Sequence, residues 1–124
     1  MAIAESGQRD QRELAAFHLD RGRRFFEQGN DGEATAELRR ALYLSPYEAD
    51  AHLLLGRIYL RTGRTQAAID AFKISLWSSE SAAAHVALAQ AYVQAKNPAG
   101  ARSEAQRALA LDPDSAEARA LLRP

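Results

Sequence analysis

The 124-residue sequence contains no cysteine, which excludes disulfides, thiol nucleophiles and cysteine-ligated metal sites. No apolar run approaches the roughly 18 residues of a membrane helix, and the first ten residues lack the charged-then-apolar pattern of a signal peptide. Sixteen basic residues balance sixteen acidic ones, so no net charge attracts the chain to nucleic acid or anionic lipid. We therefore expect a cytoplasmic protein, or a soluble domain of a larger protein, that neither binds nucleic acid nor inserts into a membrane.

β-Branched residues are also scarce, whereas alanine and leucine, both strong helix formers, contribute 27 and 15 residues. Hydrophobic residues make up 47% of the sequence and charged residues 26%, as in ordinary globular domains. The composition therefore predicts one folded, all-α domain.

One unit occurs three times in the sequence, at a spacing of 34 or 33 residues. Segments 34–46 and 101–113 both end in a Leu-x-Pro stop, and segment 68–80 fills the same place without the proline. Upstream of each segment lies a group of three residues, namely a histidine, a small residue and an aromatic residue. The three groups are His18, Gly22 and Phe25; His52, Gly56 and Tyr59; and His85, Ala89 and Tyr92. A fixed period of this length is typical of stacked helical repeats.

These residues resemble the tetratricopeptide repeat family, whose unit is a helix–turn–helix. The resemblance implies an α-solenoid of three repeats at 15–48, 49–81 and 82–115, with an N-terminal extension of the first helix at 1–14 and a C-terminal capping helix at 116–124. Three departures from the family pattern are Arg21 for leucine, Glu80 for proline and Ala105 for an aromatic residue. We expect helices over 8–28, 32–44, 48–61, 65–78, 82–95, 98–110 and 115–122.

The side chains form no recognised catalytic pattern, because the serines lack a Gly-x-Ser-x-Gly context and no phosphate-binding glycine loop is present. The acidic residues fall at helical positions that we expect to be exposed. His18, His52 and His85 occupy the same place in successive repeats, too far apart to converge on one zinc ion, and are interpreted as packing residues. The sequence predicts no enzyme activity, no metal and no cofactor.

The resemblance further implies a concave groove lined by one face of the first helix of each repeat. On that face apolar residues flank an arginine or glutamine, and the eleven groove residues are Leu19, Arg23, Phe26, Leu53, Arg57, Leu60, Arg61, Val86, Gln90, Val93 and Gln94. Such a stripe can belong to the core, but these helices already have another apolar face to bury. We therefore predict a protein–protein interaction module or scaffold that binds an amphipathic, acidic-flanked peptide or helix of another protein.

One ligand class is excluded by the same resemblance. Family members that bind a chaperone's C-terminal carboxylate use lysine, asparagine and arginine at five positions. These positions here hold Leu19, Arg23, Leu54, Ala83 and Ala87, so we do not predict that ligand.

A second surface is predicted from Tyr43, Ile74 and Trp77 on the second helices. Tyr43 and Trp77 occupy a position that the family normally leaves polar and outward, and Ile74 lies one turn before Trp77. Exposed aromatic residues there favour a convex contact patch. The alternative is that Trp77 folds over the short turn at 78–81. A self-assembling structural or oligomerisation unit, which uses this patch or the end helices, is therefore the competing function.

Overall fold

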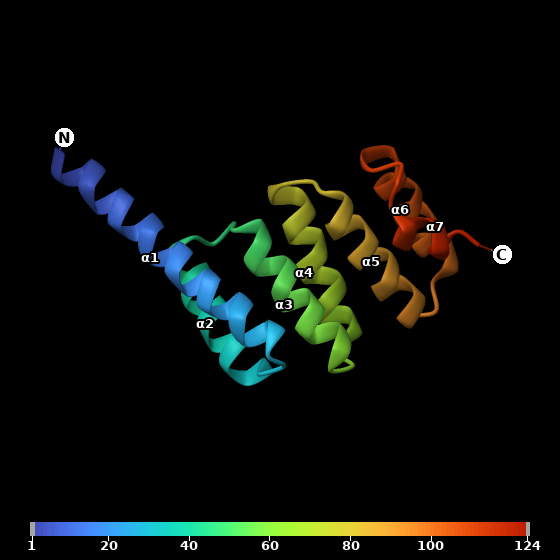
Figure 1. The fold of residues 1–124 in the computed structure, drawn as a ribbon, viewed down its shortest axis with the longest axis horizontal. Coiled ribbons are helices and arrows are strands. Elements are labelled where there is room, and N and C mark those ends of the chain that lie inside the picture. The colour runs from blue at the N-terminus through green and yellow to red at the C-terminus, as the bar shows by residue number, and fades with distance from the viewer. Residues whose placement is uncertain (1, 124) are drawn as a thin grey trace.

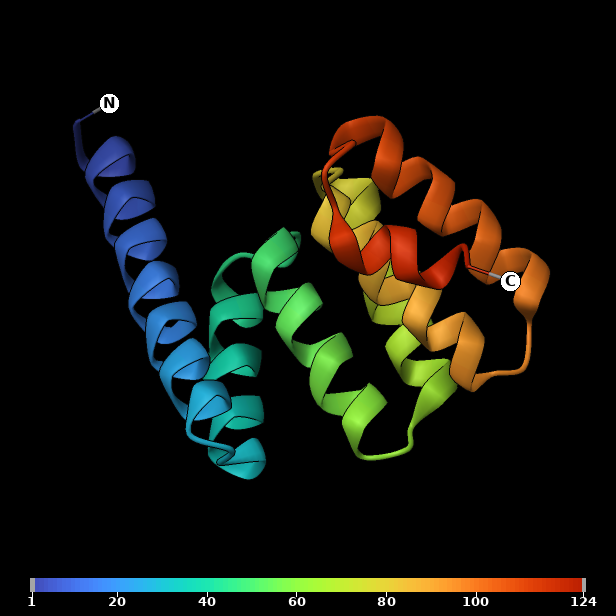
Figure 2. The ribbon, with the colours of Figure 1, turned by 45° about the vertical axis from the view of Figure 1, so that its right-hand side comes forward.

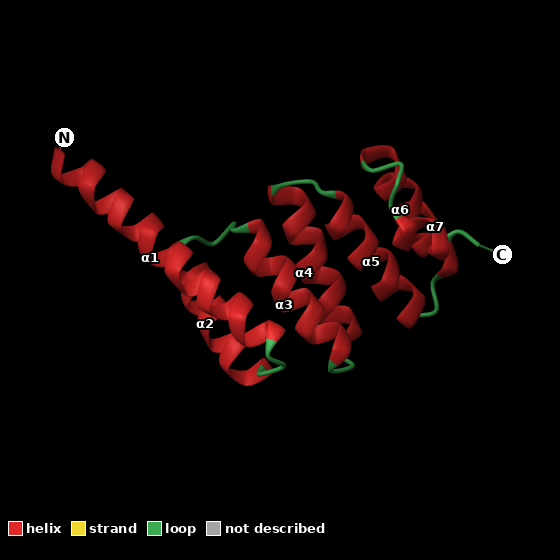
Figure 3. Cartoon of the chain, viewed as in Figure 1, coloured by secondary structure: helices red, strands yellow, loops and turns green. Residues whose placement is uncertain are grey.

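The computed structural model describes the backbone of residues 2–123 and the side chains of residues 7–123. This range contains seven helices and no strand (Figure 3). The helices are α1 (Ala2–Glu27), α2 (Asp31–Leu44), α3 (Ala49–Arg61), α4 (Thr65–Ser78), α5 (Ala82–Gln94), α6 (Pro98–Leu111) and α7 (Ala116–Leu121). The predicted all-α architecture is confirmed, although α1 begins well before the expected residue 8.

The helices form three pairs, α1 with α2, α3 with α4 and α5 with α6, which follow one another along the long axis (Figure 1). The N-terminal part of α1 projects beyond α2 and away from the other helices in both views (Figures 1 and 2). At the opposite end α7 packs against α5 and α6. The arrangement is the predicted solenoid with a capping helix.

The same turn ends the first helix of every pair. Gly29 and Gly63 have positive φ angles of 80° and 83°, and Lys96 takes the equivalent place with φ 60°. In each case the N–H of the next residue donates to the carbonyl five residues earlier, which satisfies a helix-terminal acceptor. Lysine is less suited than glycine to this left-handed conformation.

Small residues let the paired helices approach closely, as the repeat pattern predicts. A methyl group at Gly56 would overlap with the ring of Phe72, and one at Gly22 would overlap with the side chain of Leu38. Phe72 and Leu38 are among the largest fully buried side chains in the described range. Gly22 therefore sets the distance between the two helices of the first pair, and Gly56 sets the distance between the two helices of the second pair.

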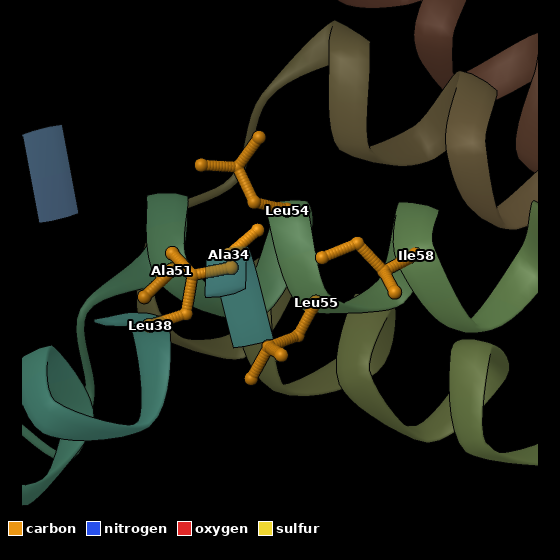
Figure 4. Close-up of a cluster of buried hydrophobic side chains, with 6 residues drawn as sticks. All are labelled: Ala34, Leu38, Ala51, Leu54, Leu55 and Ile58. Carbon is orange, nitrogen blue, oxygen red and sulfur yellow. The ribbon is translucent and has the colours of Figure 1, made fainter. Parts of the chain in front are cut away.

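The core continues from one repeat to the next. Figure 4 shows its first cluster, in which α2 contributes Ala34 and Leu38 and α3 contributes Ala51, Leu54, Leu55 and Ile58. A second cluster joins α4 to α5 around Phe72, and a third buries Ala118 of α7 against Val86 and Ala108. Each pair thus buries apolar surface against the next element, as stacked repeats require.

Arg21 replaces the family's leucine at the first end of this stack. Its guanidinium lies over the rings of Phe17 and Phe25, at 5.6 and 5.8 Å from their centroids. The equivalent Leu55 and Leu88 are buried by neighbouring repeats, but no described helix packs on the outer side of α1. An arginine suits this end because its stem covers aromatic surface while its charge stays in water.

Candidate interaction surfaces

The apolar groove residues lie along α1, α3 and α5, but most of them also pack against the following repeat. Leu19 and Phe26 contact the first core cluster, Leu53 and Leu60 contact the second, and Val86 belongs to the third. The inference that this stripe needs a cover from outside the chain is therefore wrong for most of its length. The cover comes from within the chain, where α1 contacts α3, α3 contacts α5 and α5 contacts α7.

Other groove residues remain accessible. Val93 is 54% exposed, and Gln90 and Gln94 beside it on α5 are exposed as well. The amide of Gln94 donates to the hydroxyl of Thr65 at 2.6 Å. The accessible part of the predicted groove is thus more polar than the sequence pattern suggests.

Two of the three groove arginines already have acidic neighbours. Arg23 lies 3.6 Å from a carboxylate oxygen of Asp50. Arg61 pairs with Asp31, and its guanidinium lies 4.3 Å from the ring centroid of Phe26. The Arg23–Asp50 pair is solvent-exposed and therefore weak, whereas Arg61 also donates to the carbonyl oxygen of Phe26.

Arg57 differs from the other two arginines. It is partly buried on α3, and within residues 7–123 its side chain makes no ion pair or hydrogen bond with the protein. Arg57 therefore presents an uncompensated positive charge on the predicted binding face.

Four of the five positions of the chaperone-binding carboxylate clamp hold residues without a polar side chain, and Arg23 is the exception. Leu54 and Ala87 are buried in the core, and Ala83 offers only a methyl group. This agrees with the prediction that the chain does not use that clamp.

A buried histidine–glutamate contact recurs in two repeats. Nδ1 of His18 lies 2.6 Å from Oε2 of Glu37, and Nδ1 of His85 lies 2.6 Å from Oε2 of Glu104. An arginine three residues after each glutamate contacts its other oxygen. Glu37 and Glu104 are 4% and 7% exposed, so the expectation that the acidic residues lie on exposed positions is wrong for these two.

The electrostatics of Glu37 follow from these contacts. Burial alone would raise the pKa of its carboxyl group. The hydrogen bond with His18 and the charges of Arg21 and Arg40 together outweigh that effect, and the pKa is lowered from its ordinary value of 4.5. Glu37 is therefore held in its ionised form as part of the α1–α2 contact.

His85 contacts a second carboxylate, which explains the family departure at Glu80. Its Nε2 lies 2.8 Å from Oε2 of Glu80, at the place where the family has proline. Both ring nitrogens of His85 therefore face carboxylate oxygens, those of Glu80 and Glu104. The side chain of His85 thus links the α4–α5 turn to α6.

His52 has a different partner. Its Nε2 donates to the carbonyl oxygen of Pro46 at 2.9 Å, and Ala71 stands where the other repeats have glutamate.

Within residues 7–123, no group of three or more histidine, aspartate or glutamate side chains is arranged to hold a metal ion. None of the helices in the described range is long and apolar enough to span a membrane.

The second predicted surface is exposed and includes a residue that the sequence reasoning missed. Tyr43 and Trp77 are 86% and 76% exposed. Trp77 does not fold over the following turn; its ring instead lies 5.4 Å from that of Tyr47, centroid to centroid. Ile74, Trp77 and Tyr47 line a common hollow, whereas Tyr43 does not line it.

Comparison with known proteins agrees with this architecture. Two tetratricopeptide repeat family models match residues 19–76 and 82–122. The chain belongs to the tetratricopeptide repeat family, whose fold is that of protein–protein interaction modules. No curated protein sequence matches the chain.

Several solved structures share the fold. The first TPR of Spaghetti (RPAP3), bound to the HSP90 peptide SRMEEVD, has a TM-score of 0.86 and 21% identity over 90% of both chains. The second TPR domain of human RPAP3, in complex with the HSP70 peptide SGPTIEEVD, has a TM-score of 0.80 and 19% identity over 93% of this chain and 94% of that one. YrrB, a TPR protein with an unusual peptide-binding site, has a TM-score of 0.81 and 24% identity over 97% of this chain and 60% of its own.

Proposed function

We propose that the chain binds an acidic, partly apolar peptide or helix of another protein on the face formed by α3 and α5. The observation that carries this proposal is Arg57, a half-buried residue whose guanidinium has no carboxylate partner among residues 7–123. A ligand carboxylate would form a charge-assisted hydrogen bond with it, and such bonds are about twice as strong as neutral ones.

The surroundings of Arg57 support an amphipathic ligand. Leu53 and Leu60 lie four residues before and three after it on α3, which places all three on one helix face. Both leucines are partly buried against the core and so offer limited apolar surface. Val93 on α5 is the one exposed residue among the apolar residues of the predicted groove, and we assign it as the main apolar contact.

The structurally similar RPAP3 domains support an acidic peptide as the class of ligand, but not recognition of the peptide's terminal carboxylate. The peptides bound to the two RPAP3 domains end in Glu-Glu-Val-Asp, and are thus acidic with an apolar residue. This chain lacks the clamp residues for a terminal carboxylate, because Leu54 and Ala87 are buried at those places. We therefore propose that it recognises internal acidic side chains, through Arg57 with help from Arg23 and Arg61.

The proposed mechanism is passive. The helices that carry the face are fixed by the core, so binding orders few protein side chains and the association cost falls mainly on the peptide. Charge complementarity would guide the encounter and set the register of the peptide. No catalytic step is involved.

A peptide selection tests the proposal. Random twelve-residue peptides displayed on phage would be selected on the full chain, and we expect enrichment of aspartate or glutamate beside leucine, isoleucine or phenylalanine. Arg57→Glu should weaken the selected peptides at least about tenfold, the loss expected for a central interface contact. Leu53→Glu is a poor probe, because Leu53 also packs against the core.

Arg102→Glu supplies the matched control. Arg102 is an exposed residue of α6 and makes no described ion pair, so the variant has the same charge change away from the proposed face. Equal binding of the selected peptides to wild type and to Arg57→Glu would overturn the proposal. So would a selection that yields no acidic peptides.

Self-association is the second candidate function, and exposed apolar residues on α1 favour it. Leu14 and Phe17 are 47% and 53% exposed on the side of α1 that no described helix covers. Such an end face can pair with another copy. Sedimentation velocity over a wide concentration range should then show a rising mass that Phe17→Ser abolishes, whereas a strict monomer would remove this candidate.

A further inference from the structure

A separate hollow of about 460 Å³ lies between the α2–α3 turn and α4. None of the groove residues lines it. Its walls are Pro46, Tyr47, His52, Lys73, Ile74 and Trp77. It is thus a second concave surface, distinct from the proposed peptide-binding face.

The two aromatic rings of the hollow are exposed rather than buried. Trp77 is 76% and Tyr47 65% exposed, and their ring planes are tilted by 58°. Within residues 7–123, neither the indole N–H of Trp77 nor the hydroxyl of Tyr47 makes a hydrogen bond with the protein. Aromatic residues are enriched at interface cores, and both polar groups are free to bond with a ligand.

The hollow is held in shape by bonds between its walls. The hydroxyl of Ser78 at the end of α4 donates to the carbonyl oxygen of Tyr47. The hydroxyl of Ser75 donates to the carbonyl oxygen of Ala49 at 2.9 Å, and Nε2 of His52 donates to that of Pro46. The α2–α3 turn is therefore bonded to α3 through His52 and to α4 through Ser78. Little ordering of the protein is needed when a ligand binds.

The lining of the hollow contains a positive charge and no negative one. No carboxylate lines it, and its lining includes Lys73. Within residues 7–123 Lys73 forms no ion pair, and it is exposed beside Ile74. A ligand with a carboxylate next to its apolar contact would complement this charge.

The shape of the hollow favours an extended ligand over a helix. A bound helix needs a long groove for contacts spaced three and four residues apart, whereas the six residues here come from one turn, α3 and α4 and line a single hollow. Proline-rich segments bind to aromatic-lined surfaces because their extended conformation is already formed. We infer that this hollow binds an extended segment of another protein in which proline lies next to an acidic residue.

The only tryptophan of the chain gives a direct readout. The same kind of phage selection, with ten-residue peptides, would be carried out on the full chain and repeated on Trp77→Ala. We expect the peptides that depend on Trp77 to be enriched in proline with aspartate or glutamate. Their binding should shift Trp77 fluorescence to shorter wavelength, since the indole ring loses water.

Matched variants separate this site from others. Trp77→Ala should weaken these peptides at least about tenfold and Lys73→Glu about three- to tenfold. Tyr43→Ala, an equally exposed aromatic residue outside the hollow, and Arg57→Glu should leave their affinity unchanged. Because Trp77 and Lys73 are exposed, both variants should keep the wild-type circular dichroism spectrum.

Three outcomes would overturn the inference. The first is a selection in which no peptide depends on Trp77, and the second is Trp77-dependent peptides without proline or without acidic residues. The third is a fluorescence shift that appears with rising protein concentration alone, together with a rising mass in sedimentation, because the occupant would then be a second copy. Failure of the Arg57 proposal would leave all three readouts unaffected.

Discussion

In the first and third repeats, a histidine of the first helix faces a buried glutamate of the second, through His18 with Glu37 and His85 with Glu104. In the second repeat, Ala71 takes the place of the glutamate, and His52 bonds to a backbone carbonyl of the preceding turn. The outer repeats thus hold their helix pairs with a histidine–glutamate contact, whereas the middle repeat has apolar packing around Phe72.

This difference between the middle and outer repeats indicates that their histidines have different roles. Without the ionic contact, the middle repeat directs His52 to the α2–α3 turn, where it forms one wall of the aromatic hollow. The same repeat carries Arg57 on its first helix. Both proposed binding surfaces therefore include the middle repeat, which shares one surface with α5 of the third repeat and the other with the α2–α3 turn.

The largest effect should come from removing the histidine of an outer repeat. His85→Ala leaves Glu104 buried with only Arg107 as a partner, and we expect a loss of about 2–4 kcal/mol in the free energy of unfolding. His52→Ala removes one partly exposed hydrogen bond and should cost about 1 kcal/mol. Urea denaturation followed by circular dichroism measures both, and equal losses would contradict the comparison.

An intermediate effect is expected from Glu37→Gln, which keeps the shape of the side chain but removes its charge. At neutral pH it should lower the free energy of unfolding by about 1–2 kcal/mol, because a charge-assisted hydrogen bond becomes a neutral one.

The difference should depend on pH. The pKa of Glu37 is lowered in the folded chain, so its ionisation stabilises the fold above the ordinary value of 4.5, and this contribution is lost as pH falls further. Denaturation curves from pH 7 to pH 3 should therefore show the wild type losing its advantage over Glu37→Gln below about pH 4.5. A constant difference across this range would show that the charge of Glu37 does not stabilise the fold.

The smallest effect concerns the turn that ends α5. Lys96 has a positive φ angle, where the first two repeats have glycine. Lys96→Gly should stabilise the chain by about 1 kcal/mol, since the left-handed conformation costs little for glycine. Lys96→Ala should give no such gain, because alanine keeps the β-carbon. Thermal unfolding of the two variants separates these outcomes, and equal stabilisation by both would contradict the explanation.

The helices could be predicted from sequence because the repeat period places local signals where the fold needs them. Gly29 and Gly63 mark the left-handed stops, and Gly22 and Gly56 mark the close contacts between paired helices. These signals act within a few residues or recur at a fixed spacing. They can therefore be recognised in the sequence without knowledge of the tertiary structure.

The site was harder to predict, because burial there depends on distant partners. The exposure pattern of one helix does not show that Glu37 is covered by the opposite helix, although the shared spacing of 19 residues from His18 and from His85 is a usable signal. Likewise, Leu53 is covered by the next repeat, and Tyr47 joins the surface around Trp77 from a turn outside any helical pattern.

The central claim is that the middle repeat binds an acidic peptide through Arg57. The most direct measurement is a titration of the isotopically labelled chain with the selected acidic peptide, followed by amide chemical shifts in NMR spectra. The account predicts the largest shift changes around Arg57 on α3 and around Gln90 and Val93 on α5, and their loss in Arg57→Glu. Changes confined to the outer surfaces of α2, α4 and α6, or unaltered in that variant, would contradict it.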